Sequence, residues 1–520
     1  MQDQSGGTAG SATIVGSLAH YAACQPDNPA YVDPRGTASY GELFAAARRL
    51  AAWLQHAGVQ PGDTVALPLD TMPALARPAL EMLYAIAYAG ATILPFYPEV
   101  PLESRLALLA RYRAHWLIAS GAPPQVAGAT VLDPRGAGVQ DGAAAVRHDL
   151  PQTPSVYLFT SGTTGNPKAL LPTHAQLHGN VLSAARAVGT DSADRQLASV
   201  AWPSGIGLRY LLRAHAVGAA SVSAPFDDTR SGLGAVLERF GVTRIYLSPW
   251  QLRRLLQSRA PARPWPALRS IQATGAFVSS EEIAEVRERL SPNFVVSYGC
   301  NELGSVTVLG PQDAPASGGV GRLVPGMEVR VDGARGKPLA IGETGELGFR
   351  APWMCTAYVG NPQATQERFR DGWVYPGDIG SVDAAGCLTL RGRTQEVINY
   401  GGLKIWPEDV EAMLKQHPDI LDAALVGLPD PQAGETPAAF LVPRVPLDGP
   451  LPASLTEAEL KKFCGTRIDA TRVPPLFVAV AHIPRNESGK IMRGALAEAY
   501  LEARPALVGG AAKVLRAGTD

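Results

Sequence analysis

Short apolar runs alternate regularly with segments of helical periodicity in the N-terminal half of the chain, and this alternation constrains the fold most. Apolar residues at helical spacing predict helices at 40–57, around 79–89 and within 102–112. Short apolar runs predict strands at 64–69, 91–94, 116–119, 157–160, 199–201, 245–248, 271–274 and 295–298. Strands that alternate with helices form parallel sheets covered by helices, and ligands of such sheets bind at the strand-to-helix loops.

The pattern changes after Gly345, where hairpin and turn signals begin. A helix that starts at Pro407, strands near 423–427 and 438–442, a helix near 457–467 and a strand near 476–482 follow. A chain of 520 residues is also long for a single core. We therefore expect an α/β protein with a large multi-sheet α/β domain at 1–392, a boundary near Arg393, a small α+β domain at 397–505 and a flexible tail at 506–520.

Charge and cysteine usage exclude several classes of function. The 46 basic and 47 acidic residues give a net charge of −1, so the chain has no broad attraction for nucleic acid or anionic membranes. The longest uncharged stretch, 82–98, contains a glycine and two prolines, which favours a helix, a turn and a strand over a membrane span. Five scattered cysteines and an N-terminus without a basic and apolar signal predict a cytoplasmic protein.

The segment YLFTSGTTGNPKAL has the composition of an anion-binding loop. Its small residues let backbone N–H groups approach a phosphate, and its hydroxyls and ammonium add further donors. The segment is not a Walker A loop, because the spacing of Gly162, Gly165 and Lys168 differs and Ala169 stands where serine or threonine would follow the lysine. The alternative is a surface hairpin rich in serine and threonine. Downstream, Thr173 and Gln176 predict a capping box at the start of a helix.

Four further segments follow in the order SYGCNELG (297–304), GWVYPGD (372–378), LRGRTQEVINYGG (390–402) and PRNESGKIMRGAL (484–496). Each is weak by itself, because a Tyr-Gly turn, a lone aspartate in a turn or a solitary lysine on a loop usually has a structural or solvated role. Together with the phosphate loop, they resemble the adenylate-forming superfamily of acyl-CoA synthetases, nonribosomal peptide adenylation domains and luciferases. The resemblance covers about residues 40–496.

The resemblance implies a site for ATP, Mg²⁺ and CoA. It implies that Tyr298 stacks on adenine, that Asp378 and Arg393 bind the ribose, and that Lys490 and Glu302 are catalytic. The expected cofactor-binding residues are Thr160, Ser161, Gly162, Thr163, Thr164, Gly165, Lys168, Tyr298, Gly299, Asn301, Asp378, Arg393, Gly401 and Gly402, with Glu302 and Thr163 at the metal. The resemblance also implies that the domain at 397–505 is a mobile lid, that residues 393–396 are its hinge and that Gln395 is the pivot. Asn301, Pro376 and Gln395 depart from the residues usual in the family.

In the mechanism that the resemblance implies, a substrate carboxylate attacks the α-phosphorus of ATP and expels pyrophosphate, and a thiol then takes the acyl group from AMP. Fixed donors and a metal stabilise the charge that develops in the first step. Lys490 would bridge the carboxylate and the α-phosphate when the lid closes. Rotation about Gln395 would then withdraw it and admit the thiol.

The acyl pocket is expected to be lined by Trp202, Gly205, Gly275, Ala276, Phe277 and Val306, which would give mainly neutral, apolar walls. The aspartate with which relatives bind an amino-acid ammonium group is absent, so an aryl or short-to-medium acyl carboxylate is favoured. Three interpretations remain open: an acid:CoA ligase, a free-standing enzyme that loads a separate carrier protein, and a nucleotide-binding protein that has lost catalysis. INYGG resembles the acyl-CoA ligases, whereas ATILPFYPEVPLESRLALL resembles the peptide synthetases.

Overall fold

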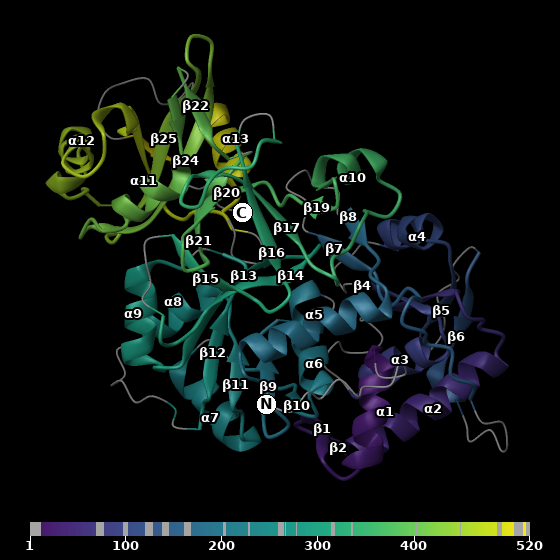
Figure 1. Cartoon of the computed structure of the whole chain (residues 1–520). Helices are drawn as coiled ribbons and strands as arrows, with labels where there is room; N and C mark the ends of the chain where they lie inside the picture. The colour runs from purple at the N-terminus through teal and green to yellow at the C-terminus, as the bar shows by residue number, and fades with distance from the viewer. Residues whose placement is uncertain are drawn as a thin grey trace.

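The computed structural model of the chain describes residues 12–68, 77–96, 102–119, 128–137, 145–160, 168–200, 204–226, 229–257, 265, 267–276, 278–313, 318–333, 336–394, 396–401, 403–447, 449–485, 491–503 and 513–515. Within these ranges the chain forms a large N-terminal domain with three sheets and a smaller C-terminal domain around a fourth sheet (Figure 1). The expected α/β architecture is confirmed.

The main sheet of the N-terminal domain is mixed. Its strands are, in spatial order, β18 (Phe369–Arg370), β19 (Trp373–Val374), β17 (Gly345–Arg350), β20 (Asp378–Val382), β21 (Cys387–Arg393), β15 (Gly319–Leu323), β14 (Gly304–Leu309), β13 (Phe294–Cys300), β12 (Ser270–Ala273), β11 (Arg244–Tyr246), β9 (Arg195–Ala198), β10 (Ala220–Val222), β1 (Pro29–Asp33) and β2 (Gly36–Ser39), with β16 (Glu328–Asp332) beside β17. The strands from β13 to β1 run parallel. The carboxyl ends of β9, β11, β12 and β13 therefore meet at one edge, where ligands of such sheets bind.

A second, fully parallel sheet has the order β4 (Thr92–Phe96), β3 (Thr64–Pro68), β5 (Ala114–Ile118) and β6 (Thr130–Leu132). The short hairpin of β7 (Leu158–Thr160) and β8 (Lys168–Leu170) stands apart from both sheets, and its register places Thr160 opposite Lys168. This hairpin carries the two ends of the predicted phosphate loop.

Helices cover these sheets: α1 (Ile14–Cys24), α2 (Tyr40–His56), α3 (Arg77–Tyr88), α4 (Leu102–Arg111), α5 (His174–Ala187), α6 (Gly205–Ala216), α7 (Arg230–Phe240), α8 (Pro249–Gln257), α9 (Ser280–Arg289) and α10 (Pro362–Arg368). The predicted capping box of α5 is confirmed, because Thr173 Oγ1 accepts from the Gln176 amide and the Gln176 side chain accepts from the Thr173 amide.

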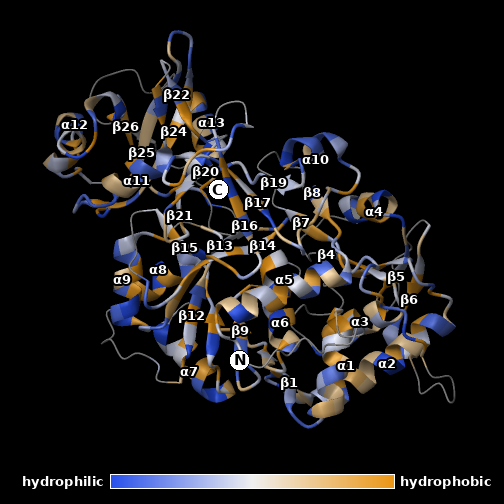
Figure 2. Cartoon of the chain, in the orientation of Figure 1, coloured by the Kyte–Doolittle hydropathy of each residue, from blue (hydrophilic) through white to orange (hydrophobic). Residues whose placement is uncertain are grey.

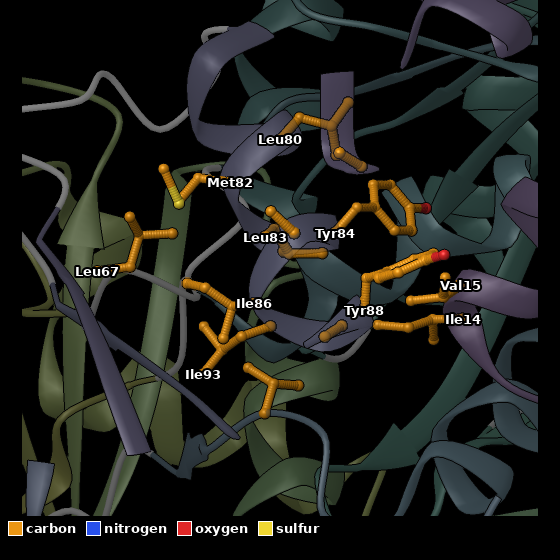
Figure 3. Packing of buried hydrophobic residues seen from close by; sticks show 14 of the residues in the cluster. Ile14, Val15, Leu67, Leu80, Met82, Leu83, Tyr84, Ile86, Tyr88 and Ile93 are labelled. Carbon is orange, nitrogen blue, oxygen red and sulfur yellow. The ribbon is translucent and has the colours of Figure 1, made fainter. Parts of the chain in front are cut away.

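Helix α3 lies in the middle of the largest apolar cluster. Tyr84 and Tyr88 extend from α3 toward Ile14 and Val15 of α1, while Ile86 extends toward the strands (Figure 3). The helix is apolar around most of its circumference, whereas α9 and α10 are mainly hydrophilic (Figure 2). Burial on both sides thus explains the near-continuous apolar sequence of α3. No helix in the described ranges is both long enough and apolar enough to cross a membrane.

The C-terminal domain lies at one end of the molecule (Figure 1). Its sheet has the order β23 (Leu403–Ile405), β22 (Ile398–Tyr400), β25 (Gly434–Pro443), β26 (Leu476–Val480) and β27 (Lys513–Leu515), with β24 (Ile420–Asp430) also paired to β25. Helices α11 (Pro407–Leu414), α12 (Glu457–Gly465) and α13 (Arg493–Ala503) accompany it.

Most predicted elements lie within a few residues of those observed, but two differ. The predicted strand at 199–201 is wrong: β9 ends at Ala198, and Ser199 and Val200 form a bend. The strand begins with the polar residues Arg195 and Gln196, and the apolar run used for the prediction starts just after the strand ends. The chain after residue 505 was expected to be flexible, yet its Lys513–Leu515 segment pairs in parallel with β26.

Candidate functional site

Glu302 follows β13 and is only 3% exposed. Its Oε1 accepts hydrogen bonds from the Tyr358 hydroxyl and, at 3.2 Å, from Arg368 Nε. Arg368 is the last residue of α10 and Tyr358 precedes this helix, so α10 and the chain leading into it bring both partners to the carboxylate. Sequence analysis placed Glu302 here but missed both partners.

The charge of Glu302 is stabilised by these partners. Burial by itself would raise the pKa of Glu302, but the positive charge of Arg368 and the hydrogen bond from Tyr358 hold that pKa below its ordinary value. The same ion pair raises the pKa of Arg368, against the effect of burial. Glu302 is therefore an anion at neutral pH.

The Glu302 carboxylate suits a magnesium ion that is held mainly by phosphates. The hydrogen bonds from Tyr358 and Arg368 both end on Oε1, and the Cys300 side chain is a further hydrogen-bond partner of the carboxylate. In the described part of the chain, no group of three or more His, Cys, Asp or Glu residues could hold a metal ion by itself. Magnesium commonly binds one or two carboxylates together with substrate phosphates and water, so the single acid fits.

The ends of the phosphate loop lie beside this carboxylate. Lys168 Nζ is 5.3 Å from the centroid of the Tyr358 ring, whose hydroxyl bonds Glu302. Thr160 lies opposite Lys168 in the β7–β8 hairpin. Residues that are far apart in the sequence thus bring an ammonium group, a threonine and a carboxylate together.

A second buried carboxylate lies at the start of β20. Asp378 is 4% exposed, accepts a hydrogen bond from the Tyr298 hydroxyl, and pairs with Arg393 Nε at 3.0 Å. Arg393 is opposite Asp378 in the register of β20 and β21, so the pairing of these two strands fixes this contact. The charge of Asp378 raises the pKa of Arg393, and burial raises that of Tyr298. The three predicted nucleotide residues are in direct contact.

Asn301 connects the phosphate hairpin to α6. Its Nδ2 donates to Phe159 O at 3.2 Å, and its Oδ1 accepts from Arg209 Nη1 at 3.1 Å. Gly205 begins α6 at the same point, where a Cβ atom would lie 2.4 Å from Asn301 Oδ1. A side chain at position 205 would therefore break this junction. Neither the junction nor Arg209 was foreseen from the sequence.

The other predicted residues occupy different environments. Gly299 sits where a Cβ atom would lie 2.0 Å from the backbone oxygen of Gly304. Gly275 and Ala276 follow β12 at the carboxyl edge of the sheet, exposed and partly exposed respectively. Val306, predicted as a pocket wall, is completely buried in a hydrophobic cluster.

Gly401 lies in the exposed turn between β22 and β23, and its amide donates to Ala433 O at 2.8 Å. Ten of the predicted residues lie outside the described ranges: Ser161, Gly162, Thr163, Thr164, Gly165, Trp202, Phe277, Gln395, Gly402 and Lys490. Their roles stay predictions.

The chain on either side of residues 486–490 is anchored. Arg485 and Ile491 form an antiparallel bridge, and Arg485 also pairs with Asp422 at 2.6 Å. At the start of α13, Arg493 faces three carboxylates at 3.1–3.5 Å, those of Glu396, Glu408 and Glu411. This cluster joins α13 to α11 and to the chain that follows β21, next to the predicted hinge.

The partners of Glu302 carried little signal in the sequence. Tyr358 and Arg368 belong to none of the five recognised segments, and tertiary folding alone brings them to the carboxylate. The one available signal was that a buried glutamate requires a cation near it. Arg209 follows Gly205, a predicted pocket residue, by four positions, but the sequence analysis assigned it no role.

Comparison with known proteins identifies the family. Residues 18–359 match the family model described as AMP-binding enzyme, and residues 409–490 match that of the AMP-binding enzyme C-terminal domain. The chain is 32% identical to a feruloyl-CoA synthase of Amycolatopsis sp over 88% of its length and 93% of the relative. It is 28% identical to a fatty acid–[acyl-carrier-protein] ligase of Streptomyces coeruleorubidus over 92% and 96% of the two chains.

The fold also matches a solved structure. The O-succinylbenzoate coenzyme A synthetase of Bacillus subtilis, in complex with ATP and magnesium, superposes with a TM-score of 0.79 and 25% identity over 92% of this chain and 98% of that one. These matches extend over both domains and confirm the superfamily that the five segments predicted. The chain belongs to the AMP-binding enzyme family.

Proposed function

We propose that the protein activates a carboxylic acid with ATP and transfers the acyl group to the thiol of coenzyme A. The observation that carries this proposal is the convergence of separate segments on one site. Lys168 reaches Tyr358 beside Glu302, and Asp378 contacts both Tyr298 and Arg393. The family membership and the relatives named as CoA ligases support the same activity.

The first step makes one oxygen of the acid part of a better leaving group, AMP. The substrate carboxylate forms a new bond to the α-phosphorus of ATP, and the bond to pyrophosphate breaks. Negative charge increases on the phosphoryl oxygens and on the leaving group, so fixed cations and donors accelerate the step. The thiol then attacks the acyl carbon, and AMP departs with the electron pair of the broken C–O bond.

Different residues would bind the triphosphate, the ribose and the magnesium ion. Lys168 and the loop after Thr160 would hold the triphosphate, and Asp378 with Arg393 would bind the ribose beside Tyr298. Glu302, kept ionised by Arg368, would offer its carboxylate to the magnesium ion. The ion would neutralise charge on the phosphates as pyrophosphate leaves.

We assign the final catalytic cation to Lys490, which would reach the reacting carboxylate when the C-terminal domain closes. The hinge at 393–396, with Gln395 as its pivot, would allow the exchange between the two half-reactions. The cluster around Arg493 supports this assignment, because it ties the start of α13 to Glu396 within the hinge and to α11 in the lid. Hinges are commonly a few residues at the end of an element.

Coenzyme A is the thiol we favour, because relatives named for ferulate and for O-succinylbenzoate are CoA synthetases. Transfer to a separate carrier protein is the second candidate, because a relative of 28% identity is named as a ligase for an acyl carrier protein. The relatives' names include aromatic and fatty acids, so the identity of the acid must come from the pocket itself. All five cysteines are free thiols, which supports the proposed cytoplasmic location.

The test is release of pyrophosphate from ATP and Mg²⁺ over a panel of aryl, alicyclic and aliphatic mono- and dicarboxylic acids, each with and without CoA. We expect sustained release only when CoA is present, with the acyl-CoA product identified by its mass. Release that does not respond to CoA would shift the assignment to a carrier protein. Absence of release with every acid would contradict the proposed activity.

A further inference from the structure

Arg209 lies in the first turns of α6, at the point where the predicted acyl pocket meets the nucleotide side. Nη1 donates to Gly205 O at 3.3 Å and to Asn301 Oδ1 at 3.1 Å, and Nη2 donates to Asn301 O at 2.6 Å. The side chain is only partly exposed. Its guanidinium therefore sits against two residues that sequence analysis had assigned to the site.

The donors of Arg209 are only partly used. A guanidinium has five N–H groups, and the three contacts above occupy both of those on Nη1 and one on Nη2. Nε is buried and has no hydrogen-bond partner in the described structure. The remaining N–H groups, on Nε and Nη2, share one edge of the plane, which is the geometry that binds a carboxylate through two parallel bonds.

The charge of Arg209 is also uncompensated. Among the described residues, no carboxylate lies within ion-pair distance of it, and Glu302, an acid that acts on it electrostatically, is already paired with Arg368. Burial lowers the pKa of Arg209, but a guanidinium keeps its proton in proteins. A buried cation without a counter-ion is costly, so a ligand that supplies an anion at this point would be favoured.

The surroundings of Arg209 are polar instead of apolar. Arg213, one turn further along α6, is 3% exposed, bonds the amide oxygens of Gln196 and Gln272 at 2.7–3.0 Å and lies over the Tyr210 ring. Three of the other buried polar atoms without a partner in the described structure lie on β9, the bend after it or α6: Gln196 Nε2, Ser199 Oγ and Tyr210 Oη. Clustered unsatisfied groups are expected where a polar ligand completes the structure.

We propose that Arg209 binds a second oxyanion of the acyl substrate through Nε and Nη2. The preferred acids are then dianions, in which one carboxylate reacts with ATP and a distant carboxylate or sulfonate bonds Arg209. This inference rests on the proposed acid activation and specifies its substrate class. It replaces the neutral pocket expected from the sequence with one that carries a positive charge.

A purely structural role for Arg209 predicts something different. The Nη1–Nη2 edge alone ties Asn301 to α6, and this contact is the same whichever acid is bound. Loss of that tie would impair every acid equally. Recognition of a second oxyanion instead predicts a loss that depends on the charge of the acid.

The experiment compares pairs of acids with the same skeleton, namely dicarboxylic acids and the monoamides of the same acids, in the pyrophosphate-release assay. The wild type should prefer the dianion, and Arg209→Met, which also loses the tie to Asn301 and so lowers kcat/KM for both acids, should lower it for the dianion by roughly 10- to 100-fold more than for the monoamide. Arg209→Lys keeps the charge but loses the fork, so its loss should be intermediate. Arg239→Met, which removes an exposed arginine of α7, is the matched control and should leave both acids unchanged.

Several outcomes would overturn the inference about Arg209. An equal loss for the dianion and the monoamide in Arg209→Met, or a wild type that prefers the monoamide, would overturn the inference and leave the proposed function intact. Activity only with monocarboxylic acids that carry no second charged group would do the same, and it needs no variant, so a folding defect in Arg209→Met cannot hide it. No release with any acid would contradict the proposed function and with it the inference.

Discussion

The arginines on the two sides of the site differ in whether a carboxylate pairs with them. On the nucleotide side, Arg368 lies 3.2 Å from the Glu302 carboxylate and Arg393 lies 3.0 Å from that of Asp378. On the predicted acyl side, Arg209 and Arg213 bond carbonyl and amide oxygens and have no ion-pair partner among the described residues. Paired charges fix the position of side chains, whereas unpaired cations create affinity for an anion. The comparison therefore separates groups that shape the site from groups that select its ligand.

A third region shows how the fold handles the opposite imbalance. Around Arg493, three carboxylates face one guanidinium. Burial, together with the negative charge of Glu411 and Glu396, raises the pKa of Glu408 to about 7 although Arg493 opposes the shift. An excess of acids can thus be relieved by a bound proton. An excess of positive charge on arginines cannot be relieved by loss of a proton, because guanidinium groups do not deprotonate in proteins.

The largest effect is expected from breaking a pair on the nucleotide side. Arg368→Met leaves Glu302 buried without its cation, so the pKa of Glu302 should rise and its charge should be lost near neutral pH. We expect adenylation to fall by about 100-fold or more at pH 7 and stability to fall by about 3 kcal/mol. Pyrophosphate release measured across pH should show the acid limb of the profile moved to higher pH.

The matched control for Arg368 is Arg370→Met, which removes the exposed partner of Glu346. Exposed pairs contribute about 1 kcal/mol or less, so this variant should retain activity. An unchanged acid limb in Arg368→Met would show that Arg368 does not keep Glu302 ionised, and the comparison would fail on its nucleotide side.

A smaller effect should follow from Asp378→Asn. The change keeps the shape of the side chain but removes the charge that pairs Arg393 and accepts from Tyr298. We expect the KM for ATP to rise by about 10-fold or more, because hydrogen bonds to charged groups are worth about 1.5–3 kcal/mol. Asp383→Asn, in the exposed turn of the same hairpin, should leave the KM unchanged. A larger change in the KM for the acid than for ATP would place Asp378 on the wrong side of the site.

The smallest effect concerns Glu408 and depends on pH. Because the folded-state pKa is raised from 4.5 to about 7, the protonated group contributes stability below about pH 4.5, and this contribution is lost as the pH rises through 7. Glu408→Gln should therefore stabilise the protein by about 1–3 kcal/mol at pH 8.5 and hardly at pH 4.5. Urea unfolding at both pH values measures this difference.

The exposed Glu457→Gln in α12 is the control for Glu408. Equal stabilities of Glu408→Gln and wild type at pH 8.5 would show that Glu408 carries no electrostatic cost. In that case the acidic cluster would not be the counterpart of the acyl-side arginines.

Sequence patterns predicted those features that depend on residue spacing within one segment. The helix at α2 and the capping box of α5 follow from side-chain spacing within one segment, and both are confirmed. Strand β9 was displaced because its Arg195 and Gln196 are polar, although Gln196 is 1% exposed and bonds Arg213. Buried polar pairs of this kind come from different elements and leave no periodic signal.

The site shows the same division. Motif order led to the prediction that Glu302, Asp378 and Arg393 belong to the site, and the structure shows each of them in an ion pair. Arg368 could not be found in this way, because it reaches Glu302 only through the packing of α10. Arg209 was invisible for a similar reason: its importance depends on which carboxylates are absent from its described surroundings, and spacing in a sequence carries no such information.

The most direct test of the central claim follows oxygen from the acid to the nucleotide. A substrate acid labelled with ¹⁸O in its reacting carboxylate is incubated with the enzyme, ATP, Mg²⁺ and CoA, and the AMP product is analysed by mass spectrometry. Attack of the carboxylate on the α-phosphorus predicts one ¹⁸O atom in each AMP molecule and none in pyrophosphate. Formation of ADP, or AMP without label, would contradict activation through an acyl adenylate.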